Sequence, residues 1–169
     1  MAVSRALAIS AAVCVLAGLF GGTPAANADP APACGPDQAT ALGVAIAHDR
    51  HEPLTQAPWS PVPVQSNFDP CADLSAAVMT IDMAKPTSPR QVFFFHRGTY
   101  IGNATTNTYP FTTLDAAASN PGLVVLNFVS GRTCGSCNDG QTRTVRYVWN
   151  GATAMMLDPI PPRQNWPIP

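Results

Sequence analysis

The stretch TRTVRYVWNGATAMML, residues 142–157, carries the strongest secondary-structure signal in the chain. Val145, Tyr147 and Trp149 alternate with mostly polar neighbours, and a period of two places alternate side chains on one face of a β-strand. The dipeptide Asn150-Gly151 that follows is a preferred sequence for a type I′ turn. The stretch therefore predicts a β-hairpin whose first strand buries Val145, Tyr147 and Trp149.

Runs of apolar and β-branched residues upstream of this hairpin predict further strands. Residues 91–96 contain three consecutive phenylalanines, as expected of a largely buried strand. The dipeptide Arg97-Gly98 predicts a turn, so the next run should return as a hairpin partner. About six strands are predicted in all, at residues 74–83, 91–96, 99–104, 123–129, 142–149 and 152–157.

One helix is predicted before the strands, at about residues 36–49. Pro36 suits a first helical turn, Asp37 the positive end of the helix dipole, and His48 the other end. The apolar stripe at helical spacing consists of Ala39, Leu42, Ala45 and Ile46. One helix followed by about six strands predicts an α+β fold, with the N-terminal helix packed on one face of an antiparallel sheet.

The connector between the helix and the first strand is rich in proline. Pro53, Pro58, Pro61 and Pro63 exclude both a helix and a central strand here, so the segment should be extended. It carries Trp59, which we interpret first as a plug that covers the core and second as a residue that stacks on a ligand.

The composition excludes several classes of protein. Charged residues make up only 11% of the chain and the formal net charge is -1, so nucleic acid is not an expected partner. Hydrophobic residues make up 46%, which excludes a wholly disordered chain. The 18 prolines and 12 glycines exclude a coiled coil or a bundle of long helices.

The N-terminus has the organisation of a secretory signal peptide. Arg5 precedes an apolar run, and Ala26-Asn27-Ala28 forms a cleavage site of small residues. The run is shorter than the roughly 20 residues that a membrane span needs. We therefore expect a signal peptide at 1–28, an extended leader at 29–33, a single domain at 34–161 and a proline-rich tail at 162–169. No transmembrane segment is expected after cleavage.

Four cysteines remain once Cys14 is removed with the signal peptide. An even number in an exported chain predicts two disulfides, most economically Cys134 with Cys137 and Cys34 with Cys71. The motif Cys134-Gly-Ser-Cys137 also invites a redox interpretation. Because the following residues predict a strand, no helix N-terminus would stabilise a thiolate, and a structural role is favoured.

Catalytic signatures such as a nucleophile elbow, a zinc-protease motif or a phosphate loop are absent from the sequence. His96, Arg97 and Trp59 are the candidate residues of a surface site. A hydrolase around His96 would need an acid and a nucleophile, for which Asp69, Asp73 and Ser75 are candidates. His48, His51 and Glu52 could share a metal, although a solvated helix end is favoured. No catalytic residue, metal or cofactor is predicted.

Three segments resemble the LppP/LprE family of actinobacterial envelope lipoproteins. They are FDPCADLS at 68–75, SPRQVFFFHRG at 88–98 and YIGNAT at 100–105, and VRYVW at 145–149 with Asp158-Pro159 is similar to the family's C-terminal hairpin. The resemblance implies a secreted or envelope location and no catalytic residue. Family members are usually lipid-anchored, whereas neither Cys14 nor Cys34 follows a suitable lipidation motif in this sequence.

The resemblance and the residues together predict an exported, non-enzymatic, monomeric protein that binds an envelope component or a partner protein. The alternative is a small exported enzyme, acting either through the Cys134/Cys137 dithiol or as a hydrolase around His96. These two hypotheses differ in whether His96 has a carboxylate partner and a nucleophile beside it.

Overall fold

The structure is a computed structural model that describes residues 34–162. The predicted signal peptide and leader, and nearly all of the predicted tail, lie outside the described residues. The elements within this range are α1 (Gln38–His48), β1 (Gln65–Ser66), β2 (Ser75–Thr80), β3 (Arg90–His96), β4 (Thr99–Asn103), β5 (Thr113–Leu114), β6 (Leu123–Ser130), β7 (Gln141–Trp149) and β8 (Ala154–Met156).

The predicted α+β class is confirmed, but the strands form two sheets where one was expected. Each sheet has four antiparallel strands that follow the chain, in the orders β1-β2-β3-β4 and β5-β6-β7-β8. Alternation along a strand indicates which face is buried, but it does not indicate which strands pair. The two-residue strands β1 and β5 were not predicted, because two residues are too few to show a period.

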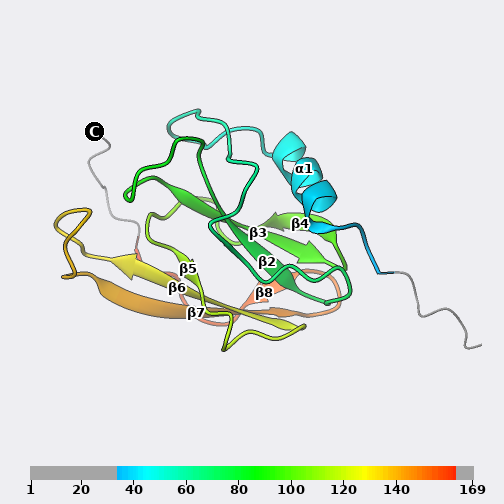
Figure 1. Ribbon diagram of the computed structural model, residues 1–169. Helices are drawn as coiled ribbons and strands as arrows, with labels where there is room; N and C mark the ends of the chain where they lie inside the picture. Colours follow the sequence, from blue (N-terminus) through cyan, green and yellow to red (C-terminus); the bar gives the residue numbers. More distant parts are fainter. Residues whose placement is uncertain (1–33, 163–169) are drawn as a thin grey trace, which may run out of the picture. The chain divides into compact units, whose positions relative to one another are not determined.

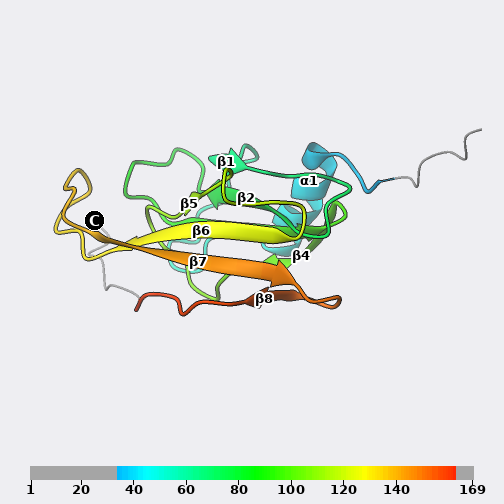
Figure 2. The same cartoon turned by 90° about the horizontal axis from the view of Figure 1, so that it is seen from below.

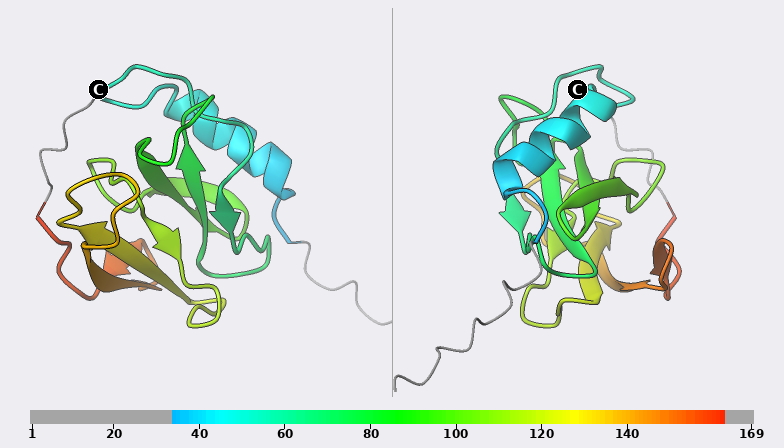
Figure 3. Two further views of the ribbon diagram at one scale, coloured as in Figure 1. Left: turned by 60° about the vertical axis from the view of Figure 1, so that its left-hand side comes forward. Right: turned by 90° about the vertical axis from the view of Figure 1, so that its right-hand side faces the viewer.

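The helix and the two sheets form three layers (Figure 1). The helix α1 covers the outer face of the first sheet, and the second sheet packs against that sheet's other face. Seen from below, β6, β7 and β8 form the layer farthest from α1 (Figure 2). The side views in Figure 3 show α1 along one side of the first sheet only.

The helix begins and packs close to its predicted position. Its N-cap is Asp37, whose carboxylate accepts a hydrogen bond from the Thr40 N–H at 2.9 Å. The predicted stripe was wrong at Ala39, which is exposed, whereas Ala41 is buried. These two residues are two positions apart, or about 200° around the helix, so they cannot share a face. Within the described residues, no helix has the length and apolar character to cross a membrane.

The strand β3 is buried on both faces and separates two apolar clusters. Phe94 belongs to the cluster between the sheets, whereas Phe93 and Phe95 belong to the cluster under α1. The first cluster consists of Leu74, Ala76, Val78, Val92, Phe94, Leu114, Val124, Leu126, Phe128, Val145 and Tyr147. The second cluster consists of Ala41, Leu42, Ala45, Trp59, Ala77, Met79, Phe93 and Phe95.

The register predicted for the C-terminal hairpin is confirmed. Val145 and Tyr147 are fully buried and Trp149 is half-buried, while Arg146 on the other face is exposed. The turn differs from the predicted two-residue type I′ turn, because Trp149 pairs with Ala154 and four residues lie between them. The side chain of Asn150 accepts hydrogen bonds from two N–H groups of this loop and so stabilises the longer turn.

Glu52 is a buried anchor for the proline-rich connector. Its side chain is 0% exposed, and its carboxylate accepts hydrogen bonds from the N–H groups of Leu54 and Thr55 at 3.0 and 2.6 Å. The Thr108 hydroxyl donates a third hydrogen bond at 2.7 Å. Because all three groups are donors, the site requires an ionised carboxylate, and it joins the connector to the loop between β4 and β5.

We predict that Glu52→Gln destabilises the fold at neutral pH. Burial raises the pKa of Glu52, but the hydrogen bonds from Thr55, Thr108 and Leu54 lower it by more, so the pKa lies below its ordinary value of 4.5. The stabilisation is therefore fully present above pH 4.5 and is lost as the pH falls through the lower, folded-state value. An amide would place a donor against a donor, which costs about 1–3 kcal/mol.

Urea unfolding of both proteins at several pH values checks this prediction. We expect a difference in unfolding free energy at pH 7 that shrinks in acid. An equal difference at pH 7 and pH 3 would show that the charge of Glu52 has no part in it.

Candidate functional site at the β3–β4 turn

Two of the three candidate surface residues, His96 and Arg97, lie where β3 turns into β4. His96 pairs with Thr99, so the predicted Arg97-Gly98 turn is a two-residue hairpin loop. Both loop residues have positive φ, 47° at Arg97 and 73° at Gly98. Positive φ is uncommon at a residue other than glycine. The Arg97 N–H donates to the Ala72 carbonyl at 2.8 Å, which holds the turn against the segment before β2.

His96 links the two sheets at this end of the domain. Its imidazole lies flat on the indole of Trp149, with ring centroids 4.0 Å apart and an interplanar angle of 13°. Its Nδ1 lies 2.7 Å from the backbone carbonyl of Asp73. Because a carbonyl oxygen can only accept, Nδ1 carries the hydrogen. The ring is thus held in one orientation by a stack on one sheet and a hydrogen bond to the segment before β2.

Arg97 and Asp73 form an exposed ion pair beside His96. The Nε and Nη2 atoms of Arg97 lie 3.2 and 3.1 Å from Oδ1 of Asp73, and the two side chains are 66% and 50% exposed. Among the described residues, Nη1 of Arg97 and Oδ2 of Asp73 have no partner. An exposed pair contributes at most about 1 kcal/mol to stability, so its free donor and acceptor are the more informative feature.

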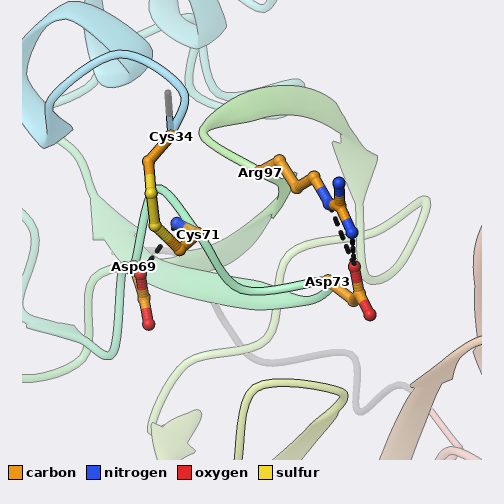
Figure 4. Close-up of a disulfide and its surroundings, with 5 residues drawn as sticks. All are labelled: Cys34, Asp69, Cys71, Asp73 and Arg97. Atoms are coloured by element: carbon orange, nitrogen blue, oxygen red, sulfur yellow. Dashed lines mark hydrogen bonds and ion pairs between the residues drawn. A yellow bond between two sulfur atoms is a disulfide. The ribbon is translucent and has the colours of Figure 1, made fainter. Parts of the chain in front are cut away.

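A disulfide lies on the other side of the same segment. Cys34 and Cys71 are bonded, as predicted, and Cys71 precedes Asp73 by two positions. Figure 4 shows the disulfide together with Asp69 and the Arg97–Asp73 pair. Asp69 accepts a hydrogen bond from the Cys71 N–H at 2.8 Å, so it stabilises the loop and does not reach His96. We refer to Asp73, His96, Arg97 and Trp149 as the polar corner.

The polar corner does not contain the nucleophile that the hydrolase hypothesis requires. Ser75 pairs directly with Phe95 in the sheet, so its side chain points toward α1, as that of Phe95 does. His96 follows Phe95 and points to the opposite face, where it meets Trp149. Ser75 is fully buried, and its hydroxyl has no hydrogen-bond partner. The partner of His96 is a backbone carbonyl, in contrast to the carboxylate that a catalytic histidine uses.

Trp59, the third candidate surface residue, is not part of the polar corner. It is 3% exposed and meets Phe93 edge-on, with centroids 5.8 Å apart, in the cluster under α1. This position agrees with its interpretation as a plug over the core. The metal hypothesis also lacks support, because the Glu52 carboxylate is occupied by three donors, and the described residues contain no group of three metal-binding side chains.

The second predicted disulfide, Cys134–Cys137, closes the tip of the β6–β7 hairpin. The strand β7 begins at Gln141, so no helix follows the motif. The side chain of Asp139 accepts hydrogen bonds from the N–H and hydroxyl of Thr133, which close the same loop without the disulfide. This tip lies at the start of β7 and Trp149 at its end, about 26 Å apart at 3.3 Å per residue.

The stack of His96 on Trp149 was not predicted. Trp149 was assigned to the buried face of its strand, which is correct, but 53 positions separate the two residues and no local pattern connects them. The register places Trp149 at the strand's last position, where the core ends and an aromatic ring becomes partly exposed. Gly35, which packs on the Arg97 carbonyl, was also missed, because a single glycine before a helix has many explanations.

A profile described as the LppP/LprE lipoprotein family matches residues 66–152, which include the whole polar corner. Lipoprotein LprE of Mycobacterium tuberculosis is 29% identical over 106 residues, covering 63% of this chain and 49% of that protein. LprE of Mycobacterium leprae is 26% identical over 138 residues, covering 81% and 65%. The chain spans about half the length of the first of these relatives. No solved structure matches the chain significantly.

We predict that the two disulfides differ in their contribution to stability. Cys34–Cys71 closes a loop with a sequence separation of 37, and its loss should lower the unfolding free energy by about 3–4 kcal/mol. Cys134–Cys137 has a separation of 3 within a loop that Thr133 and Asp139 also close, so its loss should matter much less. Denaturant unfolding of the two double Cys→Ser variants measures both effects.

An insulin-reduction assay adds the functional comparison. We expect no turnover by the wild-type protein. Turnover that disappears in Cys134→Ser would overturn the structural interpretation of this disulfide.

Proposed function

The chain belongs to the LppP/LprE lipoprotein family, and from this premise we propose that it is an exported envelope protein that binds a hydroxyl-rich envelope component, such as a cell-wall polysaccharide, through the polar corner. The proposed role is binding without catalysis. The observation that carries it is the exposed Arg97–Asp73 pair, which keeps a free donor and a free acceptor side by side.

The chemistry of the polar corner supports this class of ligand. A hydroxyl group both donates and accepts hydrogen bonds, so neighbouring hydroxyls can bind Nη1 of Arg97 and Oδ2 of Asp73 together. The two charges offset each other, which does not favour a strongly charged ligand. His96 is held by Trp149 and by the Asp73 carbonyl, so its free ring edge is preorganised for a further polar contact.

The export proposal rests on the N-terminal motif and on the family. The relatives are named lipoproteins, and a lipoprotein is attached through an acylated cysteine. In this chain the sulfur of Cys34 is bonded to Cys71, so the same sulfur cannot also carry a lipid. We therefore propose that the mature protein is released or held in the envelope by binding rather than by a lipid on Cys34.

We predict that the secreted protein begins at Asp29 and carries no lipid. Cleavage after Ala28 leaves four cysteines in two disulfides, so the intact mass should equal that of residues 29–169 minus four hydrogens. Mass spectrometry of protein purified from the culture medium and from the envelope measures this. A diacylglycerol-sized addition on Cys34 would contradict the proposal.

The binding proposal is tested with insoluble cell wall from a mycobacterium as the probe. The variant Asp73→Ala/Arg97→Ala removes the exposed pair of the polar corner. The control is Arg146→Ala/Asp158→Ala, which removes the second ion pair found among the described residues, at 2.8 Å between β7 and the segment after β8. Both variants lose one positive and one negative charge, so the net charge is unchanged in each.

We expect co-sedimentation of the wild-type protein and of the control, and binding about tenfold weaker in the polar-corner variant, or about 1.4 kcal/mol. Equal binding by all three proteins, or none by the wild-type protein, would overturn the proposed function. Release of soluble sugar that depends on His96 would instead support the hydrolase hypothesis.

A further inference from the structure

We propose that the Cys34–Cys71 disulfide gates the polar corner, so that the corner is assembled only after the chain reaches an oxidising compartment. This inference concerns the regulation of the proposed binding site, and its purpose therefore rests on the proposed function. The gating itself is a property of the fold and can be measured without a ligand.

The segment from Cys71 to Asp73 connects the disulfide to the polar corner. At one end, the Cys71 sulfur is bonded to Cys34. At the other end, the Asp73 carbonyl accepts a hydrogen bond from His96, and the Asp73 carboxylate accepts one from Arg97. Only Ala72 lies between them, and its carbonyl accepts the Arg97 N–H at 2.8 Å. The described side-chain hydrogen bonds of His96 and Arg97, and that of the Arg97 N–H, are thus made to residues within two positions of Cys71.

Gly35 and Pro36, which follow Cys34, pack against the Arg97-Gly98 turn. The Gly35 N–H donates to the Pro70 carbonyl at 2.9 Å. A Cβ atom at Gly35 would overlap the carbonyl oxygen of Arg97, and one at Gly98 would lie 2.9 Å from Pro36. The disulfide therefore clamps two chain segments around the Arg97-Gly98 turn, in which Arg97 has a positive φ that is unfavourable for a residue other than glycine.

Without the disulfide, few interactions would hold this arrangement. The Arg97–Asp73 pair is exposed and contributes at most about 1 kcal/mol. The main-chain hydrogen bonds that remain include Gly35 N–H to the Pro70 carbonyl, Leu74 N–H to the Pro121 carbonyl and Arg97 N–H to the Ala72 carbonyl. Leu74 is anchored in the cluster between the sheets, whereas Asp73 and Arg97 are exposed. In contrast, the β6–β7 pair is held by a long antiparallel ladder, and its Val124, Leu126, Phe128, Val145 and Tyr147 belong to the cluster between the sheets. Opening of the corner can therefore occur with the sheets intact.

The redox step is an ordinary thiol–disulfide exchange. The thiolate of one cysteine attacks a disulfide oxidant of the exported compartment and forms a mixed disulfide, releasing one thiol. The thiolate of the second cysteine then attacks the protein sulfur, forms the Cys34–Cys71 bond and releases the second thiol. The protein loses two electrons and two protons, and the oxidant's disulfide becomes two thiols.

Amide hydrogen exchange, measured by NMR, tests the gate. We compare wild type with Cys34→Ser/Cys71→Ser, and use Cys134→Ser/Cys137→Ser as the control that loses the same number of sulfurs. We expect the Arg97 and Gly35 amides to exchange roughly 100-fold faster in the first variant, with the β6–β7 amides still protected. The control should match the wild-type protein at all of these amides.

A second pair of variants keeps both disulfides in case the first variant does not fold. Gly35→Ala places a methyl group against the Arg97 carbonyl, and it should open the same amides. Gly43→Ala, on the helix with nothing near its Cβ position, is its control and should change none of them. Unchanged exchange at Arg97 in both test variants would overturn the gate. Equal loss of protection at Arg97 and in β6–β7 would also overturn it, because the disulfide would then stabilise the whole fold without a local effect.

Binding to the insoluble cell wall separates the gate from the proposed function. If the wild-type protein does not bind the cell wall, but the Arg97 amide exchanges faster in Cys34→Ser/Cys71→Ser than in wild type, the proposed function fails and the gate stands. If the wild-type protein binds and the first variant binds equally well with a protected Arg97 amide, the gate fails and the function stands.

Discussion

The burial of β3 on both faces is the constraint on which the other layers depend. Phe93 and Phe95 must be covered on one side and Phe94 on the other, so the strand needs a helix above it and a second sheet below it. Aromatic side chains bury large areas, and leaving either face in water would remove several kcal/mol of apolar stabilisation. The last residue of this strand, His96, is carried to the end of the domain in a position that the phenylalanines determine.

The sequence predicts the local parts of this fold better than their assembly. The alternation of Val145, Tyr147 and Trp149 reports a property of one strand, and the structure agrees with it. The arrangement of the two sheets depends on contacts between distant segments, such as the hydrogen bond that joins Leu114 N–H of β5 to the Gln65 side chain of β1, which no period in the sequence encodes. The helix boundary was predictable from Asp37, but the buried face was displaced, because small alanines give a weak stripe.

The same distinction applies to the polar corner. The turn residues His96 and Arg97 and both disulfides could be identified from local chemistry and cysteine arithmetic. The alternation of side chains along a strand places Ser75 and His96 on opposite faces of the sheet. This argument needs the pairing of Ser75 with Phe95, which only the structure supplies. The stack of His96 on Trp149 depends on how the two sheets pack face to face, and this packing cannot be predicted from single strands.

A disulfide lies near each end of β7, and the two disulfides stabilise the chain to different degrees. At the start of the strand, the Cys134–Cys137 loop is already closed by Thr133 and Asp139, so its disulfide removes little conformational entropy. At the far end, Trp149 supports a turn in which Arg97 and Gly98 both have positive φ and are held by exposed, weak contacts. A disulfide has the greatest effect where the chain it closes is long and the groups beside it are exposed. Cys34–Cys71 meets both conditions, and it does so beside the residues whose polar groups remain free.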